Sequence, residues 1–379
     1  MSNDHRLGLR LLAILLALAP LRAARASDTT ALEKLSIHGF LTQAYAWTDG
    51  SRLLGITEDG TSDYRNVALQ FRYQMSDDDT FLVQLAHTRE GESLAQQARE
   101  DVELDWAFYQ RKLPYGALVK IGRVPIPIGI YNEVRDVGTV LPFYAPPVSI
   151  YDTSSFTNET IDGLVLVKNT TWSSGWGLES AFYVGDSETI EVLKDIGVVG
   201  TATTEGYGFQ LWLTTPLQSL RVGTGFNKYS VSGGLLQLHE KDHAKSHTFS
   251  IDGDFNRVLV HAEYLRRDSQ FGLPGLAVPD VDTTGSYLQV GFRVTPKLTL
   301  WGQVDRQVIN FNLPFLNRDI DFWEDVALSA SYAVSSNVIF RVEYHQNDGY
   351  FAEDQDSNVL LGGPPISTDY GIVSLSASF

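Results

Sequence analysis

The chain has 379 residues, with 29 basic and 46 acidic side chains and no cysteine. Its formal net charge of −17 argues against nucleic-acid binding, which needs a basic surface. The lack of cysteine excludes disulfide bonds. After residue 26 no apolar run is long enough for a transmembrane helix, so a membrane role would have to use strands.

Residues 1–26 have the features of a secretory signal peptide. A polar head with Arg6 and Arg10 precedes a short apolar core, and Ala24-Arg25-Ala26 fits the small-x-small cleavage pattern. The apolar core is too short to span a bilayer. We predict cleavage after Ala26 and export of residues 27–379; an uncleaved N-terminal anchor is the alternative. Cleavage removes four arginines and Asp4, leaving 25 basic and 45 acidic residues and a net charge of −20.

From Leu35 onward, apolar and polar residues alternate with period two, which predicts strands with one apolar face and one polar face. Val67, Leu69, Phe71 and Tyr73 give one example, each followed by a smaller or polar residue. In the strand predicted over Val102–Gln110, the alternation places Trp106 and Phe108 on the apolar face and Glu103 and Asp105 on the polar face.

The predicted connections alternate between short and long, which gives about 16 strands with both termini on the short-turn side. The short ones are Ser76–Asp79, Arg111–Gly116, Thr170–Gly175, Thr215–Gln218, Asn256–Arg257, Thr295–Lys297 and Ala333–Ser336. The long ones are Asp49–Asp63, Glu90–Asp101, Val124–Thr160, Asp186–Thr204, Val231–Lys245, Asp268–Thr283, Val308–Asp321 and Asp348–Ser367.

The polar face of these strands carries charged residues such as Lys120, Arg221, Asp305 and Glu343. A packed core would reject them, whereas a water-filled lumen accepts them. The predicted strands are also longer than the average soluble strand of about 5–6 residues. We therefore predict an all-β fold, a transmembrane antiparallel β-barrel. A soluble exported all-β carbohydrate-binding protein is the alternative fold.

The C-terminus ends in Phe379, with Leu375 and Val373 in phase with it. This resembles the last strand of outer-membrane proteins, whose final phenylalanine belongs to the signal read by the barrel-assembly machinery. The wider pattern resembles the Gram-negative outer-membrane porin superfamily. The resemblance implies a 16-stranded homotrimer in the cell outer membrane, surrounded by lipid and lipopolysaccharide, with the third external loop folded into the lumen.

The third long connection lies within Gly122–Asp162, which holds Pro125, Pro127, Pro142, Pro146 and Pro147. Proline cannot donate to a ladder, so this is not a central strand, yet its apolar content argues against disorder. We predict that residues 124–160 form the constriction loop. Its start, GRVPIPIGIYNEVRD, is similar to porins related to the phosphate-selective type. No basic, serine-rich ladder accompanies it, so phosphate selectivity does not carry over.

A pore selects by its width and by the charges at its constriction. Candidates on the loop are Glu133, Arg135, Asp136 and Asp152; candidates on the wall are Arg72, Lys120, Arg123 and Arg341. Arg135 and Asp136 could alternatively form a structural ion pair that holds the loop to the wall. The predicted function is passive diffusion of small hydrophilic solutes or ions, with no enzymatic activity, cofactor or bound metal.

One motif points to a different function. His239-Glu240-Lys241-Asp242-His243 matches the H-E-x-x-H pattern of zinc metallopeptidases, and His247 continues the spacing. The pattern requires a helix, and here it enters an alternating strand. An outer-membrane barrel hydrolase is therefore kept as an alternative, with a solvated charged loop as the preferred interpretation.

Overall fold

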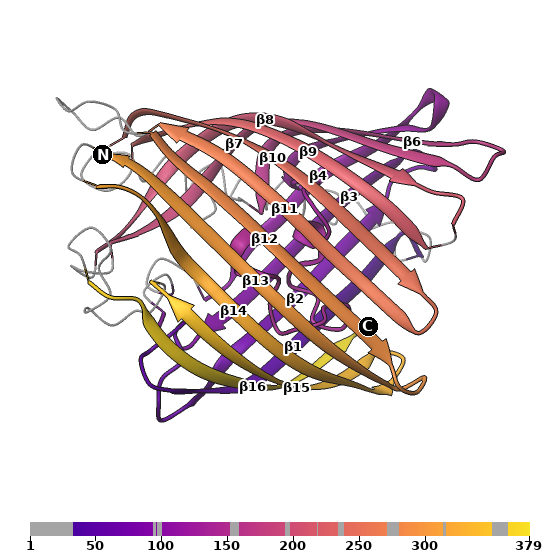
Figure 1. Cartoon of the computed structure of the whole chain (residues 1–379). Coiled ribbons are helices and arrows are strands. Elements are labelled where there is room, and N and C mark those ends of the chain that lie inside the picture. Colours follow the sequence, from indigo (N-terminus) through magenta and orange to yellow (C-terminus); the bar gives the residue numbers. More distant parts are fainter. Residues whose placement is uncertain are drawn as a thin grey trace.

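The computed structural model describes residues 33–93, 96, 101–151, 159–193, 198–217, 219–233, 239–270, 280–313, 316–350 and 363–379. The chain folds into a closed barrel of 16 antiparallel strands, each paired with its neighbours in sequence, and β1 pairs with β16 (Figure 1). The predicted fold class is confirmed. The strands are β1(Leu35–Asp49), β2(Thr61–Gln74), β3(Asp79–Glu90), β4(Glu103–Leu113), β5(Ala117–Pro125), β6(Thr160–Thr171), β7(Gly177–Leu193), β8(Val198–Thr214), β9(Leu220–Gly233), β10(His239–Phe255), β11(Val258–Gln270), β12(Asp280–Arg293), β13(Leu298–Leu313), β14(Leu316–Ser335), β15(Val338–Gly349) and β16(Ile366–Ser378).

The seam between the first and last strands closes the barrel. β1 and β16 pair from Phe40↔Ser378 to Asp49↔Asp369. Beyond this ladder, Gly39 and Phe379 exchange two backbone hydrogen bonds of 3.1 and 3.0 Å. The Phe379 ring lies directly over Gly39, where a Cβ atom would come within 2.7 Å of it. Glycine at position 39 therefore leaves room for the terminal ring.

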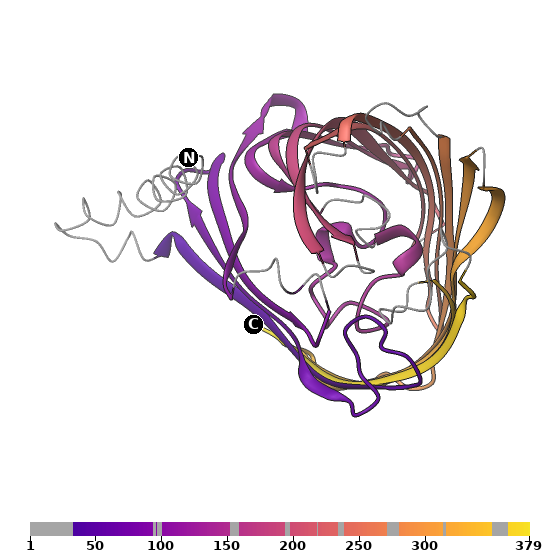
Figure 2. The ribbon, with the colours of Figure 1, turned by 90° about the vertical axis from the view of Figure 1, so that its left-hand side faces the viewer.

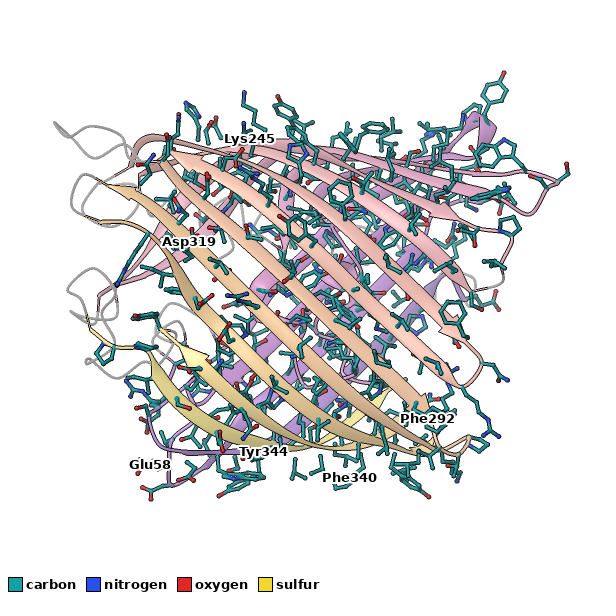
Figure 3. All side chains as sticks on the ribbon, in the orientation of Figure 1. Glu58, Lys245, Phe292, Asp319, Phe340 and Tyr344 are labelled. Carbon is teal, nitrogen blue, oxygen red and sulfur yellow. The ribbon has the colours of Figure 1, made fainter. Side chains whose placement is uncertain are left out.

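The two faces of the barrel wall differ in polarity. On β15, Phe340, Val342 and Tyr344 are exposed on the outside, whereas the alternating residues Arg341 and Glu343 point inward and are buried. In Figure 3 the side chains of Phe292, Phe340 and Tyr344 project outward from the wall. An apolar outer belt around a closed barrel with polar groups inside is the pattern of a transmembrane β-barrel, because closure leaves no unpaired strand edge in lipid. This is the architecture of bacterial outer-membrane proteins.

The polarity of β4 differs from the sequence prediction. The pairing of β3 with β4 shifts between Gln84 and Leu85, so that one extra residue is inserted near Asp105. As a result Phe108 points inward and is buried. The ring of Tyr109 instead lies 5.3 Å from the exposed Phe81 ring on the outer face. Trp106 packs against the same inward cluster as Phe108. The prediction that Trp106 and Phe108 belong to the apolar outer face is wrong, because a bulge reverses the faces beyond it.

The connections also differ in length between the two ends of the barrel. The predicted short turns are confirmed, for example between β10 and β11 and between β14 and β15. At the other end, three predicted long loops are largely strand: β7 continues to Leu193, β9 to Gly233 and β13 to Leu313. These hairpins extend beyond the apolar belt of the barrel. Their polar residues had suggested loops, because strands outside the belt need no apolar face.

Helices in the described residues are short. They include η2(Pro114–Gly116), η3(Asn132–Val134) and α3(Val148–Tyr151). Within the described ranges, no helix has both the length and the apolar character needed to cross a membrane. The predicted signal peptide, residues 1–26, lies outside the described residues and stays a prediction.

Candidate functional site

The connection between β5 and β6 turns into the barrel and lies inside the ring of strands (Figure 2). It is described over residues 126–151 and at Glu159. Its hydrogen-bond partners come from strands around much of the wall, namely Asn66, Gln210, Glu263, Asp305, Ser329, Arg341 and Glu343. The prediction that the third loop folds into the lumen is confirmed.

Apolar contacts hold the loop against the wall in two places. Ile126 and Ile128 pack in a buried cluster with Val124, Ile161 and Tyr183. Farther along the loop, a second cluster joins its residues to β11 and β12: Tyr131, Leu141, Ile150, Tyr151, Leu265 and Tyr287. Burial of these side chains explains how a proline-rich segment without a ladder is ordered.

Three inward-facing carboxylates of the wall accept hydrogen bonds from backbone N–H groups of the loop. Glu263 on β11 accepts from Ile130 at 3.2 Å, and Asp305 on β13 accepts from Ser149 at 3.3 Å. Glu343 on β15 accepts from Tyr144 with both carboxylate oxygens, at 2.9 and 3.1 Å. Charge-assisted bonds of this kind are stronger than neutral ones. The wall thus supplies acceptors on alternate strands for N–H groups of the loop that take part in no ladder.

Arg341 satisfies carbonyl groups of the same loop. Its Nη2 donates to the Gly138 and Leu141 carbonyls at 2.8 and 2.5 Å, and its Nε donates to Ser331 Oγ at 3.2 Å. Arg341 is only 1% exposed. Arg341 is therefore not a charge that lines the lumen, as predicted, but a buried donor that supports the loop from the wall.

Glu133 and Lys120 are the candidate charges that meet across the gap between loop and wall. Lys120 Nζ lies 3.4 Å from Glu133 Oε1, and it also lies 5.6 Å from the centre of the Phe108 ring. The Glu133 side chain is 45% exposed, so its carboxylate is accessible to water in the lumen. The pair therefore places one water-accessible carboxylate and one cation at the edge of the loop.

Arg135 and Asp136 each bind a different partner. Arg135 donates to the Tyr151 carbonyl at 2.6 Å, whereas Asp136 accepts from Asn66 Nδ2 on β2 at 2.7 Å. Arg135 therefore stabilises the loop by a contact within it, and Asp136 attaches the loop tip, residues 132–136, to the wall. The alternative of an ion pair between the two neighbours does not describe these contacts.

Asp136 also belongs to a group of three carboxylates. One carboxylate oxygen each from Asp105, Asp136 and Glu159 lie within 4.8 Å of one another. Gln84 donates to Asp105 at 2.6 Å. Burial, together with the charges of Asp136 and Asp105, raises the pKa of the Glu159 carboxyl well above its ordinary value of 4.5. These oxygens are the ligand type that Ca²⁺ or Mg²⁺ prefers, although repulsion is equally relieved by protons.

Of the remaining candidates, Arg123 and Arg72 are described by the structure, and neither lies beside residues 132–136 of the loop. Arg123 pairs with Asp162 at 2.8 Å and follows Ile121 and Leu164 on the outer face of β5 and β6. Arg72 shares the inward face of β2 with Gln70 but lies near the short-turn end, where it is exposed. Asp152 lies outside the described residues.

The H-E-x-x-H segment lies in a strand. His239 to His243 belong to β10, and residues four apart on a strand are separated by about 13 Å. Zinc ligands must instead converge within one coordination sphere of about 2 Å radius. His243 Nδ1 lies 2.9 Å from Ser230 Oγ, and His247 is exposed beside the Phe226 ring. The geometry required for the metallopeptidase alternative is not formed by this strand.

Several residues that position the loop were not among the sequence candidates. They are Asn66, Asn132, Tyr151, Glu159, Glu263, Asp305 and Glu343. Alternation predicts that Asp305 and Glu343 face inward. It does not predict that they contact the loop, because that depends on the path of the loop through the barrel. For Asn132 the sequence offers only a weak indication, a side-chain amide close to a proline-rich turn. Its Nδ2 donates to the Ile126 carbonyl at 2.8 Å.

The fold has close counterparts among solved outer-membrane structures. No protein-family model matches the chain, and no curated protein matches it. OmpT of Vibrio cholerae in its trimer form superposes with a TM-score of 0.58 at 12% identity, covering 91% of this chain and 99% of that chain. Salmonella typhi OmpF in complex with daunomycin gives 0.60 at 14% identity, with coverage of 91% and 97%. The outer membrane channel DcaP of Acinetobacter baumannii gives 0.59 at 10% identity, with coverage of 91% and 97%. At the level of the fold, the resemblance to porin barrels is confirmed.

Proposed function

We propose that this protein is a porin of the Gram-negative outer membrane, through which small hydrophilic solutes or ions diffuse passively. The observation that carries the proposal is the loop anchored across the lumen, with the exposed carboxylate of Glu133 paired to Lys120 at its edge. A loop held inside the barrel narrows the passage through it, which is the feature expected of a selective pore. Narrowing plus fixed charge is how such pores choose among solutes.

The proposal includes a weak preference for cations. Near residues 132–136 of the loop, the carboxylates of Glu133, Asp136 and Asp105 outnumber the cations of Lys120 and Arg135. Fixed negative charge in a narrow passage raises the local concentration of cations. The solute itself is not specified by this balance.

Three associations complete the proposal. Outer-membrane lipid and lipopolysaccharide would cover the apolar belt, and the trimer form of the Vibrio cholerae OmpT structure supports a homotrimer here. Phe379 would serve as part of the signal for the barrel-assembly machinery, and this residue is 67% exposed, on the outer side of the seam.

The deciding experiment is conductance in planar lipid bilayers. Purified protein should give discrete current steps, and a salt gradient should give a reversal potential with the sign of a cation preference. Protein that is folded, as judged by heat-modifiable migration in gels, and yet gives no steps would contradict the porin proposal. Peptidase activity lost in Glu240→Ala and on chelation would instead support the hydrolase alternative.

A further inference from the structure

Glu343, which accepts the Tyr144 N–H of the loop, also contacts the imidazole of His345 on the same strand. His345 Nε2 lies 3.2 Å from Glu343 Oε2, and its Nδ1 lies 3.0 Å from Asp325 Oδ2. All three side chains are buried, and His345 is 5% exposed. A histidine is thus inserted between the loop acceptor on β15 and a second carboxylate on β14.

The direction of these hydrogen bonds determines how many protons the ring carries. Glu343 already accepts the Tyr144 N–H, and Asp325 already accepts from Gln303 Nε2 at 3.3 Å. An ionised carboxylate has no proton to donate, so each ring nitrogen facing one must itself be a donor. Only the doubly protonated imidazole donates at both positions. The geometry therefore describes a cation between two anions.

The ring is also in contact with both the wall and the loop. It stacks on Tyr370 of β16 at 4.2 Å with an interplanar angle of 12°, and its edge meets the loop residue Phe143 at 5.6 Å. The next charged groups are Asp305, beyond Asp325, and Arg341, beyond Glu343. Asp305 and Arg341 each bind the loop as well, so His345 lies at the centre of its attachment to β13–β15.

We infer that His345 is a proton-dependent positioning residue that holds the segment around Phe143 and Tyr144 against the wall. Loss of one ring proton leaves a nitrogen lone pair facing a carboxylate and removes the cation between Asp325 and Glu343. The repulsion then acts on Glu343, the acceptor for Tyr144. The segment should release from the wall at alkaline pH and return on acidification. Its effect on permeation rests on the proposed porin function, whereas the movement itself does not.

The absence of cysteine allows one site-specific probe. A spin label on Ala145→Cys, an exposed loop position next to Tyr144, reports the motion of this segment in lipid vesicles. We expect an immobilised spectrum near about pH 7 and a mobile component that at least doubles by about pH 10, reversibly. A spectrum that stays unchanged over this range would overturn the inference.

Variants of His345 separate its charge from its bulk. With His345→Gln the mobile component should be present at neutral pH and respond little to pH. With His345→Lys, which keeps a cation up to about pH 10.4, immobilisation should be restored and the transition shifted upward. A label that stays immobilised in His345→Gln would contradict the inference. If that variant fails to fold, the pH series on the unchanged residue decides.

A second label controls for loosening of the whole barrel. Leu217→Cys in the short turn between β8 and β9 is exposed and remote from the loop, so its spectrum should not change with pH. A parallel change at both labels would assign the effect to general unfolding and overturn the inference. Because neither measurement uses current, failure of the porin proposal and failure of this one are distinguishable.

Discussion

Arg341 on β15 donates its Nη2 to the carbonyl oxygen of Leu141, which lies 200 residues earlier in the chain, at 2.5 Å. A charged side chain of the wall thereby completes the hydrogen bonding of a loop that has no ladder of its own. Together with the carboxylates Glu263, Asp305 and Glu343, it fixes the loop from the side opposite its own roots. The position of the loop inside the barrel therefore depends on side chains of the wall as well as on the loop itself.

Removing the arginine should destabilise the loop. In Arg341→Met, two loop carbonyls lose a buried donor, which costs about 1–3 kcal/mol for each group left unsatisfied. We expect the free energy of unfolding in urea to fall by about 2–5 kcal/mol and single-channel current to become noisier. Arg306→Met is the matched control, because Arg306 lies half-exposed with Asp321 and Glu324 and should matter by at most about 1 kcal/mol.

Neutralising Glu133 and neutralising Lys120 should change the ion preference in opposite directions. Glu133→Gln removes a lumen carboxylate and should lower the cation-to-anion permeability ratio by a factor of about two, whereas Lys120→Met should raise it. The reversal potential across a potassium chloride gradient measures both. Shifts of the same sign in the two variants would mean that the pair supports structure and does not select ions.

The stability of the barrel should depend on pH through Glu159. Its folded pKa is raised, so the folded state binds a proton more tightly than the unfolded state. This contribution is complete below the unfolded pKa of about 4.5 and is lost as pH rises through the higher folded pKa. The midpoint of thermal unfolding should therefore fall with rising pH, and Glu159→Gln should flatten that slope.

A matched variant isolates the cluster from other titrations. Glu58→Gln changes an exposed carboxyl in the connection after β1, labelled in Figure 3, and should leave the slope as it is. An equal slope in the wild-type protein and Glu159→Gln would contradict the assignment of a buried, proton-sharing cluster.

The outer belt should behave as a lipid-facing surface. Leu328 on β14 is 66% exposed, so Leu328→Arg would place a charge in hydrocarbon and should destabilise the folded barrel by about 2–4 kcal/mol near the bilayer midplane. Leu217→Arg, in a short turn, should cost at most about 1 kcal/mol. Unfolding in lipid vesicles measures both, and equal effects would argue against a membrane belt.

How much the sequence predicts can be followed on particular residues. Phe340 and Glu343 alternate in polarity, and period two correctly assigns them to opposite faces. Phe108 was assigned to the wrong face because a one-residue bulge leaves no mark on the pattern. Arg123 was predicted in the lumen, but it lies on the outer face and pairs with Asp162. Near the end of a strand a charged side chain can face either side of the wall, so its polarity does not assign its face.

The loop was identifiable from its prolines and from its place after the fifth strand. The hydrogen bonds that attach the loop to the wall could not be predicted, because they depend on which wall side chain reaches which backbone group. Glu343 was correctly read as facing inward, yet nothing local links it to Tyr144, 199 residues away. The mutual approach of Asp105, Asp136 and Glu159 has the same origin.

The most direct test concerns the position of the loop in the current path. Val140 lies on the loop and is 57% exposed, so Val140→Cys gives a single thiol in a chain without cysteine. Single-channel current is recorded before and after a bulky, water-soluble thiol reagent is added. The account predicts a stepwise fall in current as each label attaches. Unchanged current through a channel that has been shown to be fully labelled would contradict it.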